Sequence, residues 1–265
     1  MEEVESESKF VWNFLLKILL TPITLILVLF GKKEFKELFE PFRLLFHFIF
    51  EAKTVIILII ANIGAYIWSM FLPDATFNSL MHYPSDLFSV RAYSLITSGF
   101  LHASLEHLLG NMLALFIFGR VVERKFGAAK TALIYFGALI ISGIFSSLID
   151  TFITGSNVPG LGASGAIMGL VAAAMLIDPF YITYDLIIPL PIMIDGWIAI
   201  YADISGVINP TDDGIGHFAH IGGYLSVIIL LFLLHKEERD KMKKGLIVNL
   251  VSLAILGIIY FLFLS

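Results

Sequence analysis

Long apolar runs are the feature that most restricts how this chain can fold. The clear runs fall near residues 54–72, 98–119, 131–149, 163–177, 186–204, 216–234 and 246–264. About 20 helical residues span the hydrocarbon core of a bilayer, and backbone polar groups in lipid must find their hydrogen bonds within the chain. These runs therefore predict membrane helices, and we expect an all-α polytopic membrane protein.

The composition agrees with this expectation. Hydrophobic residues make up 58% of the chain and charged residues only 15%, whereas a soluble domain carries about 25% charged residues. The net charge is −5 with no long basic run, which argues against nucleic acid as a partner. The chain has no cysteine, so a thiolate nucleophile and cysteine metal ligands are excluded. We expect a multi-pass protein of the cell membrane, made without a signal peptide because the first ten residues, MEEVESESKF, are acidic.

The charges of the loops predict the orientation of the helices, because cytoplasmic loops collect Lys and Arg. The cation-rich segments are expected in the cytoplasm, and they are 31–53, 120–130 and 235–244. The cation-poor loops are expected outside, and they are 73–97, 150–163 and 203–213. This alternation fits six core helices, with the run 246–264 as an added seventh.

The chain divides into three expected regions. Residues 1–53 form a hydrophobic and amphipathic extension, 54–234 a membrane domain with the six core helices, and 235–265 a charged segment with the extra helix. The segment 10–30 is expected to span, the alternative being an interfacial position beside the amphipathic stretch 36–50.

Three polar clusters interrupt the apolar runs. They are FLHASLEHLLGNM with His107 and Asn111, GLGASGAIMG with Ser164, and GIGHFAHIGGY with His220. Ionisable groups inside a membrane are costly, so each is a functional-site candidate. The predicted orientation places all four residues on one side of the membrane at similar depth, as one shared site requires.

The spacing within the clusters supports the same idea. His107 and Asn111 are four residues apart and share a helical face. Small residues beside Ser164 and His220 allow close helix approach, as a nucleophile and base about 2.6–3.2 Å apart require. Singly, each cluster has a plainer explanation: glycine packing, a serine bonded to its own backbone, an interfacial histidine, or an asparagine joining two helices. Their convergence at one depth favours a site.

Other polar residues are given lesser roles. We interpret His102 and His217 as structural or interfacial, and Glu123 and Arg124 as anchors of a loop. No role is assigned to three further histidines, which are His47, His82 and His235.

At this point the residues resemble a known family. FLHASLEHLLGNM resembles the second transmembrane helix of rhomboid proteases, GASG their nucleophile motif and AHIGG their catalytic-histidine motif. The resemblance covers roughly 54–234, with the motifs in order on helices two, four and six. It implies a six-helix rhomboid-like core that cleaves transmembrane protein substrates.

The resemblance also implies roles for individual residues. Ser164 would be the nucleophile and His220 the general base, without a catalytic aspartate, cofactor or metal. His107, Asn111 and the backbone N–H of Ser164 would form the oxyanion hole. The loop 73–97 would lie partly in the membrane, and the loop near 203–214 would gate water and substrate.

Two features depart from the family pattern, a residue pair in the first loop and a single residue after the serine. Many relatives carry Trp-Arg in the first loop, where this chain has Tyr93 and Ser94. Many also place an aromatic residue four positions after the serine, stacked on the catalytic histidine. Here that residue is Met168, which predicts a looser orientation of His220, although a thioether also packs on aromatic rings.

Other functions fit less well. An inactive rhomboid-like protein that binds membrane clients is the nearest alternative, but Ser164 and His220 are both present. A transporter or channel is disfavoured because the sequence shows no internal repeat. A zinc protease would need His-Glu-x-x-His and an aspartyl type Gly-x-Gly-Asp, and the sequence contains neither.

Overall fold

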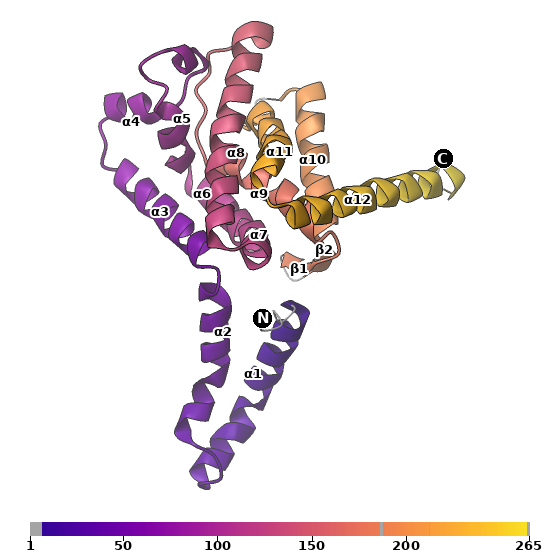
Figure 1. Ribbon diagram of the computed structural model, residues 1–265. Helices are drawn as coiled ribbons and strands as arrows, with labels where there is room; N and C mark the ends of the chain where they lie inside the picture. The colour runs from indigo at the N-terminus through magenta and orange to yellow at the C-terminus, as the bar shows by residue number, and fades with distance from the viewer. Residues whose placement is uncertain (1–6, 186–187, 212, 264–265) are drawn as a thin grey trace.

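The computed structural model describes residues 7–185, 188–211 and 213–263, and most of them are helical (Figure 1). The prediction of an all-α polytopic protein is confirmed. The central bundle consists of α3 (Lys53–Ser69), α6 (Leu105–Ala114) continued by η4 (Leu115–Gly119) and α7 (Arg120–Phe126), α8 (Ala128–Ile149) ending in η5 (Asp150–Thr154), α9 (Ser164–Ile177), α10 (Ile192–Ile208), and α11 (His217–Leu230) ending in η6 (Leu231–Leu233).

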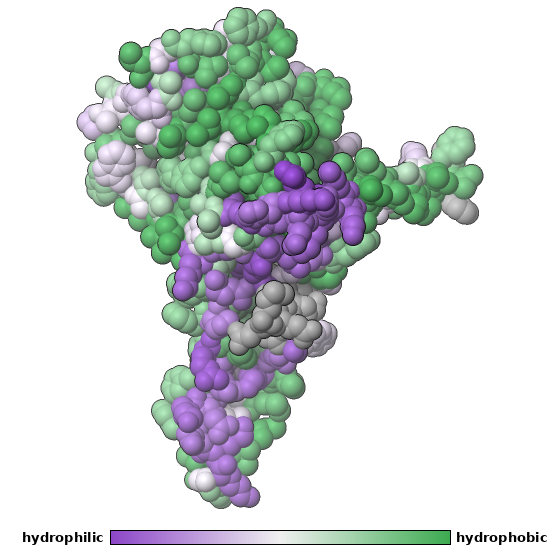
Figure 2. Space-filling model, viewed as in Figure 1, coloured by the Kyte–Doolittle hydropathy of each residue, from purple (hydrophilic) through white to green (hydrophobic). Residues whose placement is uncertain are grey.

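Several of these helices meet the requirements for crossing a membrane. Among the described residues, four helices are long and apolar enough to span, or five if a pair bent by 81° at residues 51–52 counts as one span. Figure 2 shows that apolar side chains cover most of the visible bundle surface, with a hydrophilic band near the beginning of the last helix. The bundle therefore presents the surface that lipid requires.

The helix α9 lies in the centre of the bundle. It packs against both α8 and α11, and every residue from Gly165 to Met175 except Met168 is buried. Its 14 residues measure about 21 Å at 1.5 Å each, less than the hydrocarbon thickness of about 30 Å. Asp178, just beyond its C-terminus, pairs with Lys125 at 2.6 Å and marks the charged boundary. The helix α9 is therefore too short to cross the hydrocarbon core from one surface to the other.

A short hairpin separates α9 from α10. β1 (Ile182–Asp185) and β2 (Ile188–Pro191) pair antiparallel, with Ile182 opposite Pro191. The sequence predicted a helix over 186–204, and this boundary is wrong because the helix begins only at Ile192. Pro189 and Pro191 lack the backbone N–H that a helix interior uses, which favours an extended start to this run. Residues 186 and 187 of that run lie outside the described residues.

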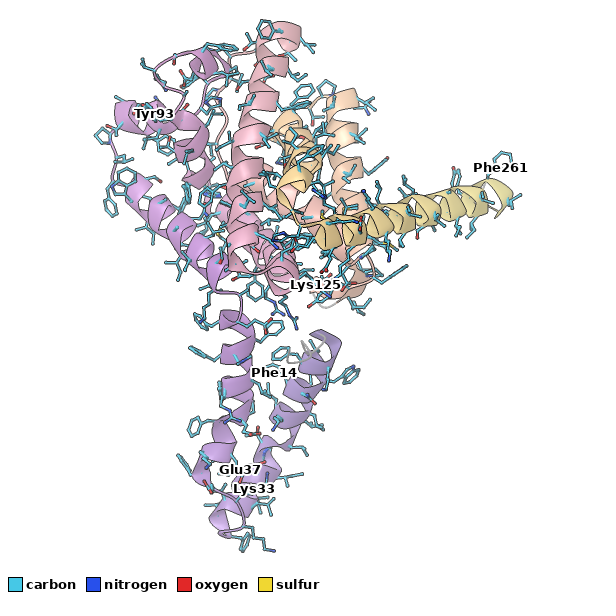
Figure 3. All side chains as sticks on the ribbon, viewed as in Figure 1. Phe14, Lys33, Glu37, Tyr93, Lys125 and Phe261 are labelled. Carbon is cyan, nitrogen blue, oxygen red and sulfur yellow. The ribbon has the colours of Figure 1, made fainter. Side chains whose placement is uncertain are left out.

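The first loop, residues 73–97, is partly helical. It contains α4 (Asp74–Leu80), η2 (Pro84–Phe88) and α5 (Ser94–Thr97), and η3 (Ser98–Phe100) follows. Figure 3 shows Tyr93 of this loop at one end of the bundle and Lys125 at the other end. The predicted topology requires the first loop and the basic junction after α7 to lie at opposite ends, as they do here.

The basic end of the bundle is held by charged contacts. The carboxylate of Glu123 accepts hydrogen bonds from the backbone N–H groups of Thr54 and Val55, both at 3.0 Å. Arg124 pairs with Glu51 at 2.9 Å. The prediction that Glu123 and Arg124 anchor a loop is confirmed, because these contacts join α7 to residues 51–55, the junction that leads into α3.

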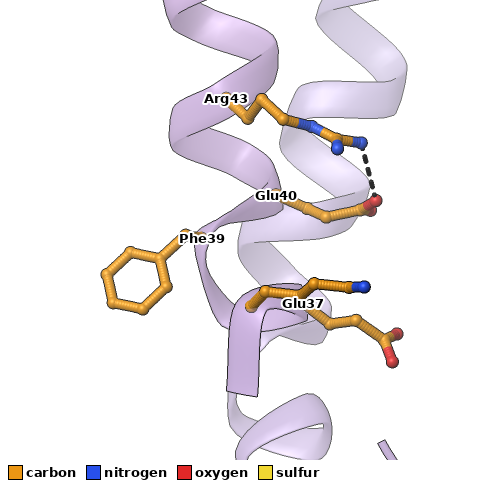
Figure 4. A pocket seen from close by; sticks show the side chains of 5 residues that line it. Glu37, Phe39, Glu40 and Arg43 are labelled. Atoms are coloured by element: carbon orange, nitrogen blue, oxygen red, sulfur yellow. Dashed lines mark hydrogen bonds and ion pairs between the residues drawn. The ribbon is translucent and has the colours of Figure 1, made fainter. Parts of the chain in front are cut away.

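The N-terminal extension folds as a helical hairpin. Its elements are α1 (Glu7–Leu29), η1 (Phe35–Phe39) and α2 (Glu40–Phe50). The rings of Phe10 and Phe48 stack with centroids 3.9 Å apart. Figure 4 shows a pocket in this hairpin, where Arg43 donates to Glu40 at 3.2 Å. The pocket residues belong to the extension alone, and they are Lys36, Glu37, Phe39, Glu40 and Arg43. Spanning by 10–30 stays a prediction, although Lys9–Leu29 qualifies by length and composition.

The last helix, α12 (Lys236–Phe263), extends sideways from the bundle, with Phe261 near its far end (Figures 1 and 3). Asn249 fastens it to two bundle helices. Its amide donates to the carbonyl of Met175 at 3.0 Å, and its oxygen accepts from the indole of Trp197 at 2.9 Å. The extra C-terminal helix is thus tied to both α9 and α10.

Candidate active site

Ser164 is the first residue of α9 and is partly buried. Two residues earlier, Gly162 adopts φ +118°, a conformation that glycine tolerates and other residues rarely adopt. A Cβ atom on Gly162 would lie 2.8 Å from the Nε2 atom of His107 and 3.6 Å from the Nδ2 atom of Asn111. The predicted His107–Asn111 pair on α6 therefore faces the backbone that leads into Ser164.

His220 lies one turn into α11, and close packing brings α11 against α9. A Cβ atom on Gly223 would lie only 2.3 Å from the carbonyl oxygen of Gly165. A Cβ atom on Gly165 would lie 3.7 Å from the carbonyl oxygen of Ala219. The residue after Ser164 thus meets the residue before His220, which places the predicted nucleophile and base on adjoining segments.

The structure brings the four predicted residues into one region. Gly162, two residues before Ser164, lies against His107 and Asn111, and Gly165, the residue after Ser164, lies near the carbonyl oxygen of Ala219, the residue before His220. In the described part of the chain, no hydrogen bond joins Ser164 to His220, a contact that commonly tightens only when substrate binds. The Nδ2 group of Asn111 is buried and makes no hydrogen bond to a described residue. This donor is therefore available for an oxygen atom that develops negative charge.

The start of α9 supplies further donors. The first N–H groups of a helix have no partner within that helix, and the helix dipole favours negative charge beside them. Ser164 thus combines a hydroxyl group, a helix N-terminus and the nearby amide of Asn111. Such an arrangement suits attack on a carbonyl carbon, because the resulting oxyanion would meet donors already in place.

The segment before Ser164 is tied to the first loop. Backbone hydrogen bonds join His82 to Gly160 in both directions, at 3.1 and 2.8 Å, and the N–H of Gly162 donates to the carbonyl of Ser98 at 2.9 Å. The loop therefore fixes the path of the chain just ahead of the nucleophile.

The side chain of His82, to which the sequence assigned no role, is a buried part of this tether. Its Nδ1 atom lies 2.7 Å from the hydroxyl of Ser94 and its Nε2 atom 2.8 Å from the hydroxyl of Ser147. Burial lowers the pKa of His82 below its ordinary value. No local signal marked this histidine, because its partners lie 12 and 65 residues away. Ser94, one of the departures from the family pattern, therefore has a structural role as a hydrogen-bond partner of His82.

A carboxylate contacts the predicted base, and no motif in the sequence predicts this contact. The Nδ1 atom of His220 lies 2.8 Å from Oδ1 of Asp203, and the Nδ1 atom of His217 lies 2.9 Å from the same oxygen. The hydroxyl of Tyr224 donates to Oδ2 at 2.8 Å. Asp203 was placed at the start of an external loop, but α10 continues to Ile208 and buries it. The sequence signal that could have indicated a polar partner was the spacing of His217, His220 and Tyr224, because this spacing places all three side chains on one face of α11.

His217, which was expected to be structural or interfacial, is a second hydrogen-bond partner of Asp203, as a structural role allows. Its Nε2 atom lies 3.4 Å from Oδ2 of Asp213 in the loop before α11. Hydrogen bonds from the N–H of Ile215 and the hydroxyl of Thr211 lower the pKa of Asp213. The expected gating by residues near 203–214 stays a prediction, and residue 212 lies outside the described residues.

His102 has the buried position that a structural role requires. Its ring lies edge-on to His107, with centroids 5.0 Å apart. A ring in contact with His107 restricts how that side chain can turn. His102 therefore helps to position His107, in agreement with its expected structural role.

One group of side chains has the spacing of metal ligands. Asp203, His217 and His220 each offer an atom within 4.8 Å of the others. In this structure the two imidazole Nδ1 atoms face the carboxylate and hydrogen-bond to it. The expectation of a metal-free mechanism stays a prediction.

The amino-acid sequence is similar to a protein-family model and to several known proteins. A family model described as Rhomboid domain matches residues 89–237. Two Arabidopsis thaliana proteins are each 29% identical: RHOMBOID-like protein 12, mitochondrial (65% of this chain, 56% of the relative) and Rhomboid-like protein 11, chloroplastic (70% and 66%). The Rhomboid protease GlpG of Photorhabdus laumondii is 29% identical over 45% of this chain and 40% of its own length. The chain thus spans less than two thirds of the length of each of these relatives.

Proposed function

The chain belongs to the rhomboid family, and from this premise we propose that it is an intramembrane serine protease. It would hydrolyse peptide bonds in or near the transmembrane helices of other membrane proteins. The observation that carries the proposal is the position of Ser164. It begins the short central helix α9, with the His107–Asn111 pair against the segment that precedes it and the helix of His220 packed against α9.

In the proposed reaction, the hydroxyl oxygen of Ser164 attacks the peptide carbonyl and His220 accepts its proton. The oxyanion is stabilised by Asn111, by His107 and by the backbone N–H of Ser164. His220 then protonates the leaving amine and later activates a water molecule, which releases the acyl group from the serine.

The substrate must also change shape. Carbonyl groups inside a helix are engaged in i→i−4 hydrogen bonds, so the cleaved segment has to unwind before attack. Glycine and proline in the substrate helix lower the cost of unwinding. The proposed substrates are therefore membrane proteins with a helix weakened by such residues.

The chain is a multi-span membrane protein. The division into an extension, a catalytic domain over 54–234 and a C-terminal appendage is part of the proposal. Location in the cell membrane stays a prediction, and two of the plant relatives are mitochondrial and chloroplastic by name.

The experiment that tests the proposal is cleavage of a model transmembrane substrate by the purified protein in detergent. The wild type should cleave and should react with a fluorophosphonate probe, whereas Ser164→Ala should do neither and keep the thermal stability of the wild type. EDTA should leave cleavage unchanged. Equal cleavage by both proteins would contradict the serine assignment. Substrate binding without cleavage or labelling would support the inactive client-binding alternative.

A further inference from the structure

Asp203 is a buried carboxylate that receives three side-chain hydrogen bonds from one face of α11. Its side chain is 7% exposed and that of His220 is 13% exposed. Asp203 comes from α10, so the contact crosses between two helices. The donors are the rings of His217 and His220 and the hydroxyl of Tyr224.

The chemistry of this contact determines where the proton of His220 lies. An ionised carboxylate only accepts hydrogen bonds, and a neutral imidazole carries its proton on one of its two nitrogens. At 2.8 Å from Oδ1 of Asp203, Nδ1 must be the protonated nitrogen. The lone pair then resides on Nε2, and the ring can accept a proton only there.

We propose that Asp203 is a positioning residue, which fixes the ring orientation and the tautomer of His220 for proton transfer from Ser164. This inference rests on the proposed protease function and deepens it. Proton transfer would then depend on Ser164, His220 and Asp203, and not only on the Ser–His dyad that the family resemblance implied. It also supplies an orienting contact for His220 in a chain that has Met168 where many relatives stack an aromatic residue.

A purely structural role for Asp203 would be to hold α10 against α11. Tyr224 offers a matched control, because its hydroxyl donates to the other carboxylate oxygen at the same 2.8 Å. The ring of His220 hydrogen-bonds to Oδ1 instead. Tyr224→Phe removes one contact between α10 and α11 and leaves the Asp203–His220 pair intact. Asp203→Asn keeps the size of the side chain but can present an N–H group to Nδ1, which would favour the opposite tautomer.

The first measurement is steady-state cleavage of the model substrate by the full chain in detergent. Asp203→Asn should lower kcat by at least about 100-fold and change KM by less than about twofold, as expected when a base is in the wrong tautomer. Tyr224→Phe should stay within about threefold of the wild type. Asp203→Glu, which keeps the carboxylate, should be at least about tenfold more active than Asp203→Asn.

The second measurement does not depend on catalysis. ¹⁵N NMR of histidine-labelled protein, in a Ser164→Ala background at a pH where an ordinary histidine is neutral, reports which nitrogen is protonated. The His220 signal is identified by its loss in His220→Gln. Nδ1 should carry the proton when Asp203 is present, and the population should move towards protonated Nε2 in Asp203→Asn. Apart from residue 203, the titratable groups near His220 and its neighbour His217 are the same in both samples, and they are His107, Tyr224 and Asp213.

The outcomes separate the two proposals. An active wild type with an equally active Asp203→Asn, or equal losses in Asp203→Asn and Tyr224→Phe, would overturn the positioning role and leave the protease proposal standing. An unchanged tautomer in Asp203→Asn would overturn it as well. A wild type that neither cleaves substrate nor reacts with the probe would overturn the protease function, and the positioning role with it.

Discussion

The Nε2 atom of His82 lies 2.8 Å from the hydroxyl oxygen of Ser147, so a side chain of the first loop is fixed to α8. Burial lowers the pKa of His82 below its ordinary value of 6.5. The folded protein therefore favours the neutral ring. The unfolded chain takes up a proton more readily as the pH falls below that value. The resulting contribution to stability is present above pH 6.5 and is lost as the pH falls towards the lower folded pKa.

We therefore predict that His82→Gln weakens the dependence of thermal stability on pH. The measurement is the Tm of the protein in detergent at pH 7.5 and pH 5. The wild type should lose more stability on acidification than His82→Gln does. His235→Gln is the matched control, because His235 is exposed and its substitution should leave the wild-type difference intact. An identical pH dependence in wild type and His82→Gln would contradict the prediction.

Gly162→Ala should abolish most of the activity. The φ of +118° is strained for alanine, at a cost of about 1–3 kcal/mol, and the new Cβ would lie 2.8 Å from the His107 ring. We expect a loss of cleavage rate of more than about tenfold, because the change displaces the oxyanion donors or the approach to Ser164. Gly160→Ala is the control, because the Cβ atom added there would have only the carbonyl oxygen of His82 within reach, at 4.0 Å. Similar rates for the two variants would show that this close approach is not needed.

The roles of base and oxyanion donor can be separated by probe reactivity. Asn111→Ala should lower kcat by about 10²–10³, the usual cost of losing one oxyanion donor, and still react slowly with the fluorophosphonate. His220→Ala should lose both cleavage and labelling, because Ser164 is no longer activated. His107→Ala should resemble Asn111→Ala. Loss of labelling in His107→Ala but not in His220→Ala would mean that the base is the other histidine.

A buried asparagine that is not among the predicted site residues serves as a control for this comparison. Asn62 donates to the carbonyl of Leu58 at 2.8 Å. Asn62→Ala should lower the Tm, because it removes a buried hydrogen bond. It should leave the labelling rate of Ser164 unchanged. An effect on labelling as large as that of Asn111→Ala would indicate general loosening of the bundle.

The fold was largely predictable from the sequence, because a lipid environment leaves few choices for an apolar run. The helices at 53–69, 128–149 and 164–177 begin and end close to the predicted limits. The β-hairpin was missed because apolar length alone does not distinguish a strand from the first turn of a helix. Pro189 and Pro191 were the local signal for the difference.

The candidate site was predictable only where its residues fall into local motifs. Ser164 and His220 each lie in a motif with glycines, and His107 and Asn111 share a helical face. Asp203 and His82 were not predicted as site residues, because their hydrogen bonds join segments that are far apart in the sequence. A charge near the end of an apolar run is assigned to a loop by default, and only the observed length of α10 buries Asp203 among its partners.

The burial of α9 on every side has a consequence for how the protein can evolve. Its small residues, such as Gly165 and Gly169, lie against neighbouring helices with no space for a larger side chain. Helices such as α1 and α12 expose most of their apolar side chains and can exchange one of these for another freely. Sequence drift should therefore accumulate at the periphery and leave the central helix nearly unchanged. Between distant descendants of this chain, α9 should remain recognisable after the flanking helices have lost all likeness.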